Sequence, residues 1–172
     1  PQRTYGTTLP EQLEQLQTDE LVLRFAAARQ RQAADSYRPL YHYVNPEGPS
    51  NDPNGFCYWQ GRYHLFYQFV PENGDRVHWG HTVSDDLVSW RDLPPALYPD
   101  KENDSFSGQS LVEADRVVAI YHGTQSGNSI ATTVSKAARR PVTTTTYLPM
   151  SQLYCKTDAR KLSRCKCNWW CA

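Results

Sequence analysis

The stretch FCYW (56–59), QG (60–61) and RYHLFYQ (62–68) decides the fold of this chain. Two runs rich in aromatic and β-branched side chains flank a two-residue gap that ends in glycine. This pattern predicts two β-strands joined by a tight turn. Successive side chains of a strand point to opposite faces. One face is therefore expected to hold Tyr63, Leu65 and Tyr67, and the other His64, Phe66 and Gln68.

The same texture of short aromatic and β-branched runs, broken by turn residues, extends from Tyr37 to about Val134. LVE (111–113) and RVVAIY (116–121) predict a second pair of strands. HWGHTV (78–83) and SFSGQ (105–109) are further candidates. Regularly spaced strands without helices between them indicate an all-β propeller, barrel or sandwich.

The segment before these strands has a different pattern, which predicts one helix over residues 9–35. Apolar residues recur at helical spacing, with one phase shift, and Thr8 is a candidate cap. Its arginines are balanced by acidic residues, so we expect a packing or leader helix rather than a membrane-surface helix. The apolar positions are Leu9, Leu13, Leu16, Leu21, Val22 and Phe25.

Charge divides the chain. The 172 residues carry 18 basic and 18 acidic side chains, a balance that excludes a dedicated nucleic-acid binder. Residues 1–133 nevertheless have a net charge of −7 and residues 134–172 one of +7, and four of the five cysteines lie in the second part. Such asymmetry marks a tail distinct from the body. We therefore divide the chain into a helical extension (1–36), a strand-rich region (37–134) and a basic, Cys-rich tail (135–172).

Two targeting features are not seen in the sequence. No apolar run approaches the roughly 18–20 residues that cross a bilayer, so no membrane association is expected. The first residues, PQRTYGTTLPEQLEQL, do not have the pattern of a signal peptide, which makes a cytoplasmic location the default expectation.

NDPNG (51–55) is the most informative cluster. Alone it is typical of a type I turn, with Pro at the second position and Gly last. Its neighbours include Gln68, HWGH (78–81), SDDLVSWRDLP (84–94) and FSG (106–108). Carboxylates and amides bind hydroxyl groups, and an aromatic face packs against the C–H side of a sugar ring. The mixture therefore favours a carbohydrate site.

With these motifs, residues 41–134 resemble the N-terminal part of the catalytic domain of glycoside hydrolase family 32, which comprises invertases, inulinases and levanases that cleave β-fructofuranosides. The matching stretches are NDPNG, GRYHLFYQF (61–69), HWGHTVSDDLVSWRDLPPALYP (78–99) and FSG. The resemblance implies a five-bladed β-propeller with an axial pocket for one fructosyl unit. Residues 41–134 have the length of about two blades. The expected fold is thus all-β, a partial propeller preceded by a helix and followed by an irregular tail.

The resemblance also implies roles for single residues. Asp52 matches the nucleophile of a retaining mechanism, in which a second carboxyl group about 5–5.5 Å away acts as acid and then base. The ligand implied is a small-molecule fructoside, with no cofactor. A metal site among His64, His78, His81 and Cys57 is not expected, because His-x-x-His alone does not supply the usual ligand set. The substrate-binding matches are Asn51, Gln68, Trp79, Phe106 and Ser107.

Two family motifs do not occur in the sequence. The acid/base is a Glu followed by Cys, but Cys155 follows Tyr154 and no Glu occurs after Glu113. The Arg-Asp-Pro motif is also absent, since Arg91-Asp92 precedes a leucine. We therefore expect a protein of β-fructofuranosidase type that is truncated before its acid/base and inactive alone. The alternative is a non-catalytic carbohydrate-binding or assembly fragment. A partial propeller leaves strand edges unpaired, which favours self-association.

Three interpretations of the tail remain open. Its cysteines, at 155, 165, 167 and 171, fit the paired spacing of a zinc module poorly. Its charge and the Trp169-Trp170 pair suit an anion- or nucleic-acid-binding tail. The third interpretation, which we favour, is a product of a shifted reading frame. No nucleic-acid partner is accordingly expected.

Overall fold

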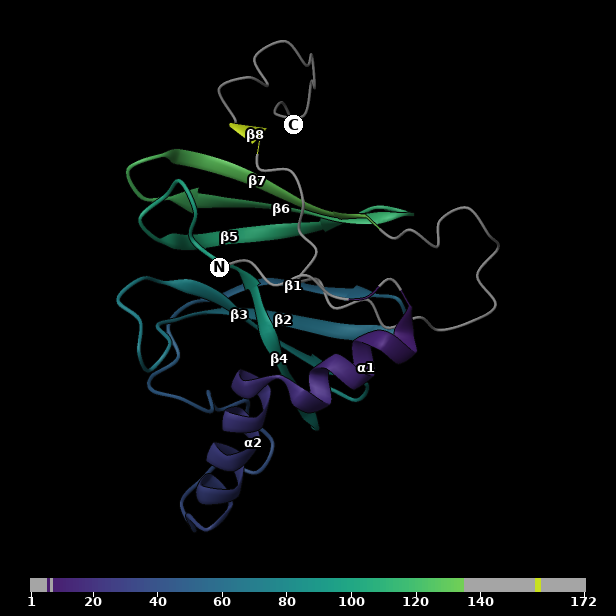
Figure 1. Cartoon of the computed structure of the whole chain (residues 1–172), viewed down its shortest axis with the longest axis vertical. Coiled ribbons are helices and arrows are strands. Elements are labelled where there is room, and N and C mark those ends of the chain that lie inside the picture. Colours follow the sequence, from purple (N-terminus) through teal and green to yellow (C-terminus); the bar gives the residue numbers. More distant parts are fainter. Residues whose placement is uncertain (1–5, 7, 135–156, 159–172) are drawn as a thin grey trace.

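The computed structural model describes residues 6, 8–134 and 157–158. These residues form two helices and two four-stranded antiparallel sheets (Figure 1). The sheets lie one beside the other, and the helices lie on the side of the first sheet that faces away from the second (Figure 1). The helices are α1 (Leu9–Thr18) and α2 (Glu20–Ala33). The first sheet has the order β1 (Pro53–Trp59), β2 (Arg62–Phe69), β3 (His78–Ser84), β4 (Trp90–Leu97), and the second the order β5 (Ser105–Val112), β6 (Arg116–Gly123), β7 (Gly127–Val134), β8 (Thr157–Asp158).

The predicted hairpin is present as β1 and β2. Trp59 pairs with Arg62 across the turn, and both turn residues have positive φ, 49° at Gln60 and 78° at Gly61. Positive φ at both central residues is the geometry that suits the twist of a two-residue hairpin. The alternation along β2 is also confirmed, because Phe66 belongs to one buried cluster and Tyr67 to another.

The main core lies between the two sheets, and both contribute apolar side chains to it. Trp79, for example, is 1% exposed and contacts Tyr121 of β6, with ring centroids 5.8 Å apart. Burial of this surface is what holds the sheets together. The cluster comprises Cys57, Trp59, Phe66, Trp79, Ala96 and Leu97 from the first sheet and Val117, Ala119, Tyr121 and Ala131 from the second.

The connection between the sheets, residues 98–104, is anchored by buried polar groups. The Glu102 carboxylate is 2% exposed and accepts hydrogen bonds from Ser105 Oγ (3.2 Å) and Tyr121 Oη (2.9 Å). Asp104 accepts from the Val77 N–H at 2.8 Å. A buried carboxylate needs such partners to offset its lost hydration. The connection is therefore part of the packed structure.

The prediction of one helix over residues 9–35 is wrong, because the segment forms two helices that meet at Asp19. The Asp19 side chain accepts hydrogen bonds from the N–H groups of Leu21 (2.9 Å) and Val22 (3.1 Å), while its own backbone is extended. An aspartate in this position caps a new helix. The phase shift in the apolar pattern is the sequence trace of this break.

Helix α2 packs against the outer face of the first sheet. Phe25 is 2% exposed, and its ring meets that of Phe69 edge to face, with centroids 6.3 Å apart. Tyr67 is buried in the same cluster. Edge-to-face aromatic pairs add to the stability that comes from area burial alone. Helix α2 thus packs on the first sheet.

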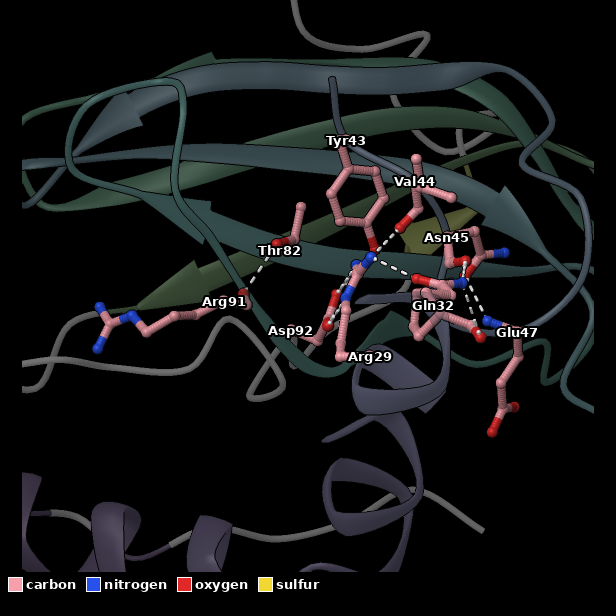
Figure 2. A network of polar contacts seen from close by, with 10 residues as sticks. Arg29, Gln32, Tyr43, Val44, Asn45, Glu47, Thr82, Arg91 and Asp92 are labelled. Atoms are coloured by element: carbon pink, nitrogen blue, oxygen red, sulfur yellow. Dashed lines mark hydrogen bonds and ion pairs between the residues drawn. The ribbon is translucent and has the colours of Figure 1, made fainter. Parts of the chain in front are cut away.

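A polar network next to this cluster joins α2 to β4 (Figure 2). The Arg29 guanidinium donates to both carboxylate oxygens of Asp92, from Nε at 2.7 Å and from Nη2 at 2.9 Å. Asp92 also accepts from Tyr43 Oη at 2.9 Å, and Arg29 donates further to the carbonyl of Val44. Burial, the largest single influence, lowers the pKa of Arg29. The hydrogen bonds to Asp92 and the attraction of its charge together outweigh burial, so that the pKa is raised overall. A bidentate ion pair of this kind fixes the position of α2 against β4 and also stabilises the fold.

The strands differ from the expectation in three places. β4 and β7 were not predicted, and the run at 105–109 continues through Leu111 and Val112 as the single strand β5. The tail contributes Thr157–Asp158 as the short β8, which pairs with Ser129 and Ile130. The four tail cysteines lie outside the described residues.

Candidate active site

Asp52 lies just before β1, and its side chain is exposed. Its backbone is fixed against the end of β2, because the Gln68 N–H donates to the Asp52 carbonyl at 3.0 Å. On the other side, the Asn51 N–H donates to the Gln68 carbonyl at 3.2 Å. The turn that carries the carboxylate is thus tied to the first sheet by two main-chain hydrogen bonds.

Three of the predicted site residues meet at this carboxylate. Ser107 Oγ donates to Asp52 Oδ2 at 2.5 Å, and Gln68 Nε2 donates to Ser107 Oγ at 2.8 Å. Gln68 Nε2 also lies 3.5 Å from Asp52 Oδ2. A short O–H···O bond to a charged carboxylate is among the stronger hydrogen bonds in proteins. Within the described part of the chain these contacts all end on Oδ2, which leaves Oδ1 uncommitted.

A β-bulge in β5 brings Ser107 to this position. Ser105 pairs with Gly123 and Gly108 with Tyr121, so that Phe106 and Ser107 together stand opposite a single residue of β6. A bulge interrupts the ladder and redirects side chains. Both Phe106 and Ser107 are exposed as a result.

A second bulge lies in β1, between Asn54 and Cys57. Gly55 within it has φ +51°, and a Cβ there would lie 2.5 Å from Ser110 Oγ of β5 and 3.2 Å from the Trp79 ring. Only glycine adopts this backbone conformation at little cost and leaves room for so close an approach. The two irregular strands therefore touch at the site.

The remaining predicted residues lie around this group. The Phe106 side chain is 38% exposed, whereas its carbonyl accepts a hydrogen bond from Trp79 Nε1 at 2.9 Å. Because Trp79 is 1% exposed, its indole contacts the protein interior and supports the Phe106 segment from behind. Asn51 is exposed next to Asp52. The structure thus brings Asp52, Gln68 and Ser107 into direct contact, with Trp79 one layer below.

One residue of the site was not predicted. Asn54 is 3% exposed, and its Oδ1 accepts a hydrogen bond from the Gly108 N–H at 3.3 Å. Its Nδ2 has no hydrogen-bond partner among the described residues. In the sequence, Asn54 is typical of a turn residue. Its position inside the NDPNG cluster was the available signal.

The histidines considered for a metal site are mainly structural. His64 Nδ1 lies 3.0 Å from His81 Nε2, and His64 Nε2 lies 3.2 Å from the Trp59 carbonyl. Burial lowers the pKa of His64 to about 4 and that of His81 well below its usual value. Across the described ranges, no cluster of three or more His, Cys, Asp or Glu side chains is arranged to hold a metal ion. In the same ranges, neither helix has the length and apolar character to span a bilayer.

Comparison with known proteins gives a family match. The family model for the glycosyl hydrolases family 32 N-terminal domain matches residues 42–152. A levanase of Bacillus subtilis is 41% identical over 109 residues, which cover 56% of this chain and 16% of the levanase. An invertase of Schizosaccharomyces pombe is 43% identical over 91 residues, 49% of this chain and 16% of the invertase. The chain thus spans about a sixth of the length of these relatives.

Solved structures of similar proteins agree with this match. The crystal structure of fructan 1-exohydrolase IIa from Cichorium intybus has a TM-score of 0.51 and 36% identity, covering 61% of this chain and 21% of that one. A sucrose-6-phosphate hydrolase from Lactobacillus gasseri has a TM-score of 0.53 and 30% identity, covering 68% of this chain and 26% of that one. The matched family range includes NDPNG, the hairpin and FSG.

Proposed function

The chain belongs to glycosyl hydrolase family 32, and on this basis we propose that it carries the nucleophile and part of the fructosyl-binding pocket of a retaining β-fructofuranosidase. The similar proteins include an invertase, a levanase and sucrose-6-phosphate hydrolases. The observation that carries the proposal is the contact of Asp52 with Ser107 and Gln68. The five-bladed propeller belongs to the same proposal, with the two sheets as two of its blades.

In this proposal, Asp52 Oδ1 is the atom that attacks the anomeric carbon of a terminal β-fructofuranoside when a second carboxyl group, from outside this chain, protonates the leaving oxygen. An ester bond to the fructosyl unit forms while the bond to the leaving-group oxygen breaks, and a later attack by water releases fructose. The hydrogen bonds from Ser107 and Gln68 hold the carboxylate by its other oxygen. Asn51, exposed directly before Asp52, and Phe106, exposed directly before Ser107, are proposed to contact the sugar.

The leaving oxygen needs a proton, and the sequence does not contain the carboxyl group that supplies it in the family. No glutamate follows Glu113, and the Glu-Cys pair does not occur. Loss of a general acid typically slows a reaction by about 10²–10⁴-fold. We therefore propose that this chain binds fructosides through its pocket half but does not turn them over alone. The second candidate function is non-catalytic carbohydrate binding, which the contact of Asp52 with Ser107 and Gln68 would serve equally.

The first experiment measures fructose release from sucrose and, separately, fructose binding by NMR titration. The variant is Asp52→Asn, and the control is Asp115→Asn, which neutralises another exposed carboxylate, in the turn between β5 and β6. We expect no release above the Asp52→Asn background and millimolar binding that Ser107→Ala weakens and Asp115→Asn does not. Release that Asp52→Asn abolishes would contradict the absence of an acid/base. No binding by the unchanged chain would contradict the pocket assignment.

A further inference from the structure

The strands that form the site, β1 and β5, belong to different sheets. Neighbouring strands within one sheet are held in position by their ladder of main-chain hydrogen bonds, but β1 and β5 share no such ladder. Ser107 and Asp52 must nevertheless meet with their oxygens 2.5 Å apart. Apolar packing brings the two strands close, and the hydrogen bond from Trp79 Nε1 to the Phe106 carbonyl (2.9 Å) holds the residue before Ser107. The residue after Ser107 is held by a separate contact.

Asn54 spans this gap from the nucleophile turn. It lies two residues after Asp52, and its Oδ1 accepts the N–H of Gly108, the residue directly after Ser107. The side-chain bond from Asn54 to Gly108 and the bond from Ser107 to Asp52 therefore run in parallel between the same two short segments. Fixing one of the two contacts restricts the other.

The burial of Asn54 indicates that an asparagine is present at this position for its hydrogen bond to Gly108 and not for packing. The side chain is 3% exposed, and its Nδ2 finds no hydrogen-bond partner among the described residues. A buried donor without a partner destabilises a fold, and an apolar residue of the same size avoids that penalty. Within the described ranges, the hydrogen bond from the Gly108 N–H to Asn54 Oδ1 is the one contact of this side chain that a leucine could not make.

We propose that Asn54 is a positioning residue, which holds the Gly108 N–H so that Ser107 Oγ stays on Asp52 Oδ2. Asn54 acts through the backbone of β5 and does not touch the substrate. The inference rests on the proposed function for its consequence in ligand binding. Its structural part, the dependence of the Gly108 contact on Asn54, stands without it.

The test uses a pair of variants that match Asn54 in size. Asn54→Leu removes the acceptor and the unpaired donor together, and Asn54→Asp keeps the acceptor oxygen. Val117→Ala serves as a control, because Val117 is 1% exposed in the core between the sheets and pairs with Val112 and Thr133, which are not site residues. Amide hydrogen exchange of Gly108 and NMR titration with fructose are measured on the full chain, and denaturant unfolding gives the stability of each variant.

We expect Asn54→Leu to fold with a midpoint near that of the unchanged chain, to raise the exchange rate of the Gly108 N–H roughly tenfold, and to weaken fructose binding by a similar factor. Asn54→Asp restores most of the protection at Gly108. Val117→Ala lowers the unfolding midpoint but leaves fructose affinity within about twofold of the unchanged value.

Two results would overturn the inference. One is unchanged exchange at Gly108 in Asn54→Leu, and the other is a loss of affinity in Val117→Ala as large as in Asn54→Leu, which would assign the effect to stability. If Asn54→Asp does not fold, comparing the Gly108 exchange rate and the fructose affinity of Asn54→Leu with those of Val117→Ala still tests the inference. If the unchanged chain binds no fructose, the proposed function fails, while exchange at Gly108 decides the positioning role separately.

Discussion

Removing the charge of Asp92 tests how firmly the helical extension is fixed to the sheet. Asp92→Asn keeps the size of the side chain but leaves the Arg29 guanidinium without its anionic partner. Breaking a fully buried pair costs about 3–5 kcal/mol. The two side chains are 20% and 8% exposed, and Arg29 retains its bond to the Val44 carbonyl. We therefore expect a loss near the lower end of that range, about 3 kcal/mol.

The matching single change, Arg29→Met, leaves the buried carboxylate of Asp92 with the Tyr43 hydroxyl as its partner and is expected to cost about 2–3 kcal/mol. The double variant Arg29→Met/Asp92→Asn combines the two single changes and removes both charges. Because the penalty for a stranded charge disappears, we expect it to be more stable than either single variant. The departure from additivity is then about 2 kcal/mol or more.

The assay is urea unfolding at pH 7, followed by the circular dichroism of the β-sheet and by aromatic fluorescence. Arg31→Met is the control, because Arg31 lies on the same helix and is exposed. It is expected to change the free energy of unfolding by less than about 0.5 kcal/mol. If Asp92→Asn is no more destabilising than Arg31→Met, the Arg29–Asp92 pair does not fix α2, and the reasoning is refuted.

Three further predictions concern the sheets. The folded pKa of His64 is about 4 and that of His81 is also lowered, whereas the ordinary value is 6.5, so the unfolded chain binds more protons than the folded chain in this range. The free energy of unfolding is therefore highest above pH 6.5 and falls by roughly 3 kcal/mol for His64 alone as the pH drops to 4. Urea midpoints at pH 7.5, 5.5 and 4.5 measure this, and a flat profile would contradict it. Gly55→Ala is expected to lower the stability measured by thermal unfolding by about 2 kcal/mol or more, because alanine disfavours φ +51° and its Cβ would meet Ser110 Oγ. Adding Ser110→Ala should recover only part of this loss. Full recovery would mean that the contact with Ser110, and not the backbone conformation, causes the destabilisation. Burial raises the pKa of the Cys57 thiol to about 11, so peptide mapping after iodoacetamide at pH 8 should find Cys57 unmodified in the folded chain and modified in urea; rapid modification without urea would contradict its burial.

Local patterns in the sequence predicted the parts of the fold that depend on local chemistry. The hairpin followed from a two-residue turn between alternating runs, and the site from motif matches at 52, 68 and 107. In the structure Asp52, Gln68 and Ser107 are in contact, and their roles stay predictions. Their separation of up to 55 residues along the chain meant that only the family resemblance, and no local periodicity, could bring them together.

The features that were missed depend on tertiary context. β4 contains Pro94 and Pro95, which argue against a strand until it is known to lie at the edge of the sheet. Asp19 reads equally well as an acidic helix residue or as a cap, and only the direction of its side chain decides. Asn54 looks like a turn residue because its partner, Gly108, lies 54 positions away.

The division of the site between two sheets links its occupancy to the folding equilibrium. Asp52 and Gln68 come from the first sheet and Ser107 from the second. A molecule that contacts all three recognises only the docked arrangement, so its binding free energy adds to the stability of the docked form, as RT ln(1 + [L]/Kd). A thermal-shift measurement on this chain would then report on ligand binding without any catalytic turnover.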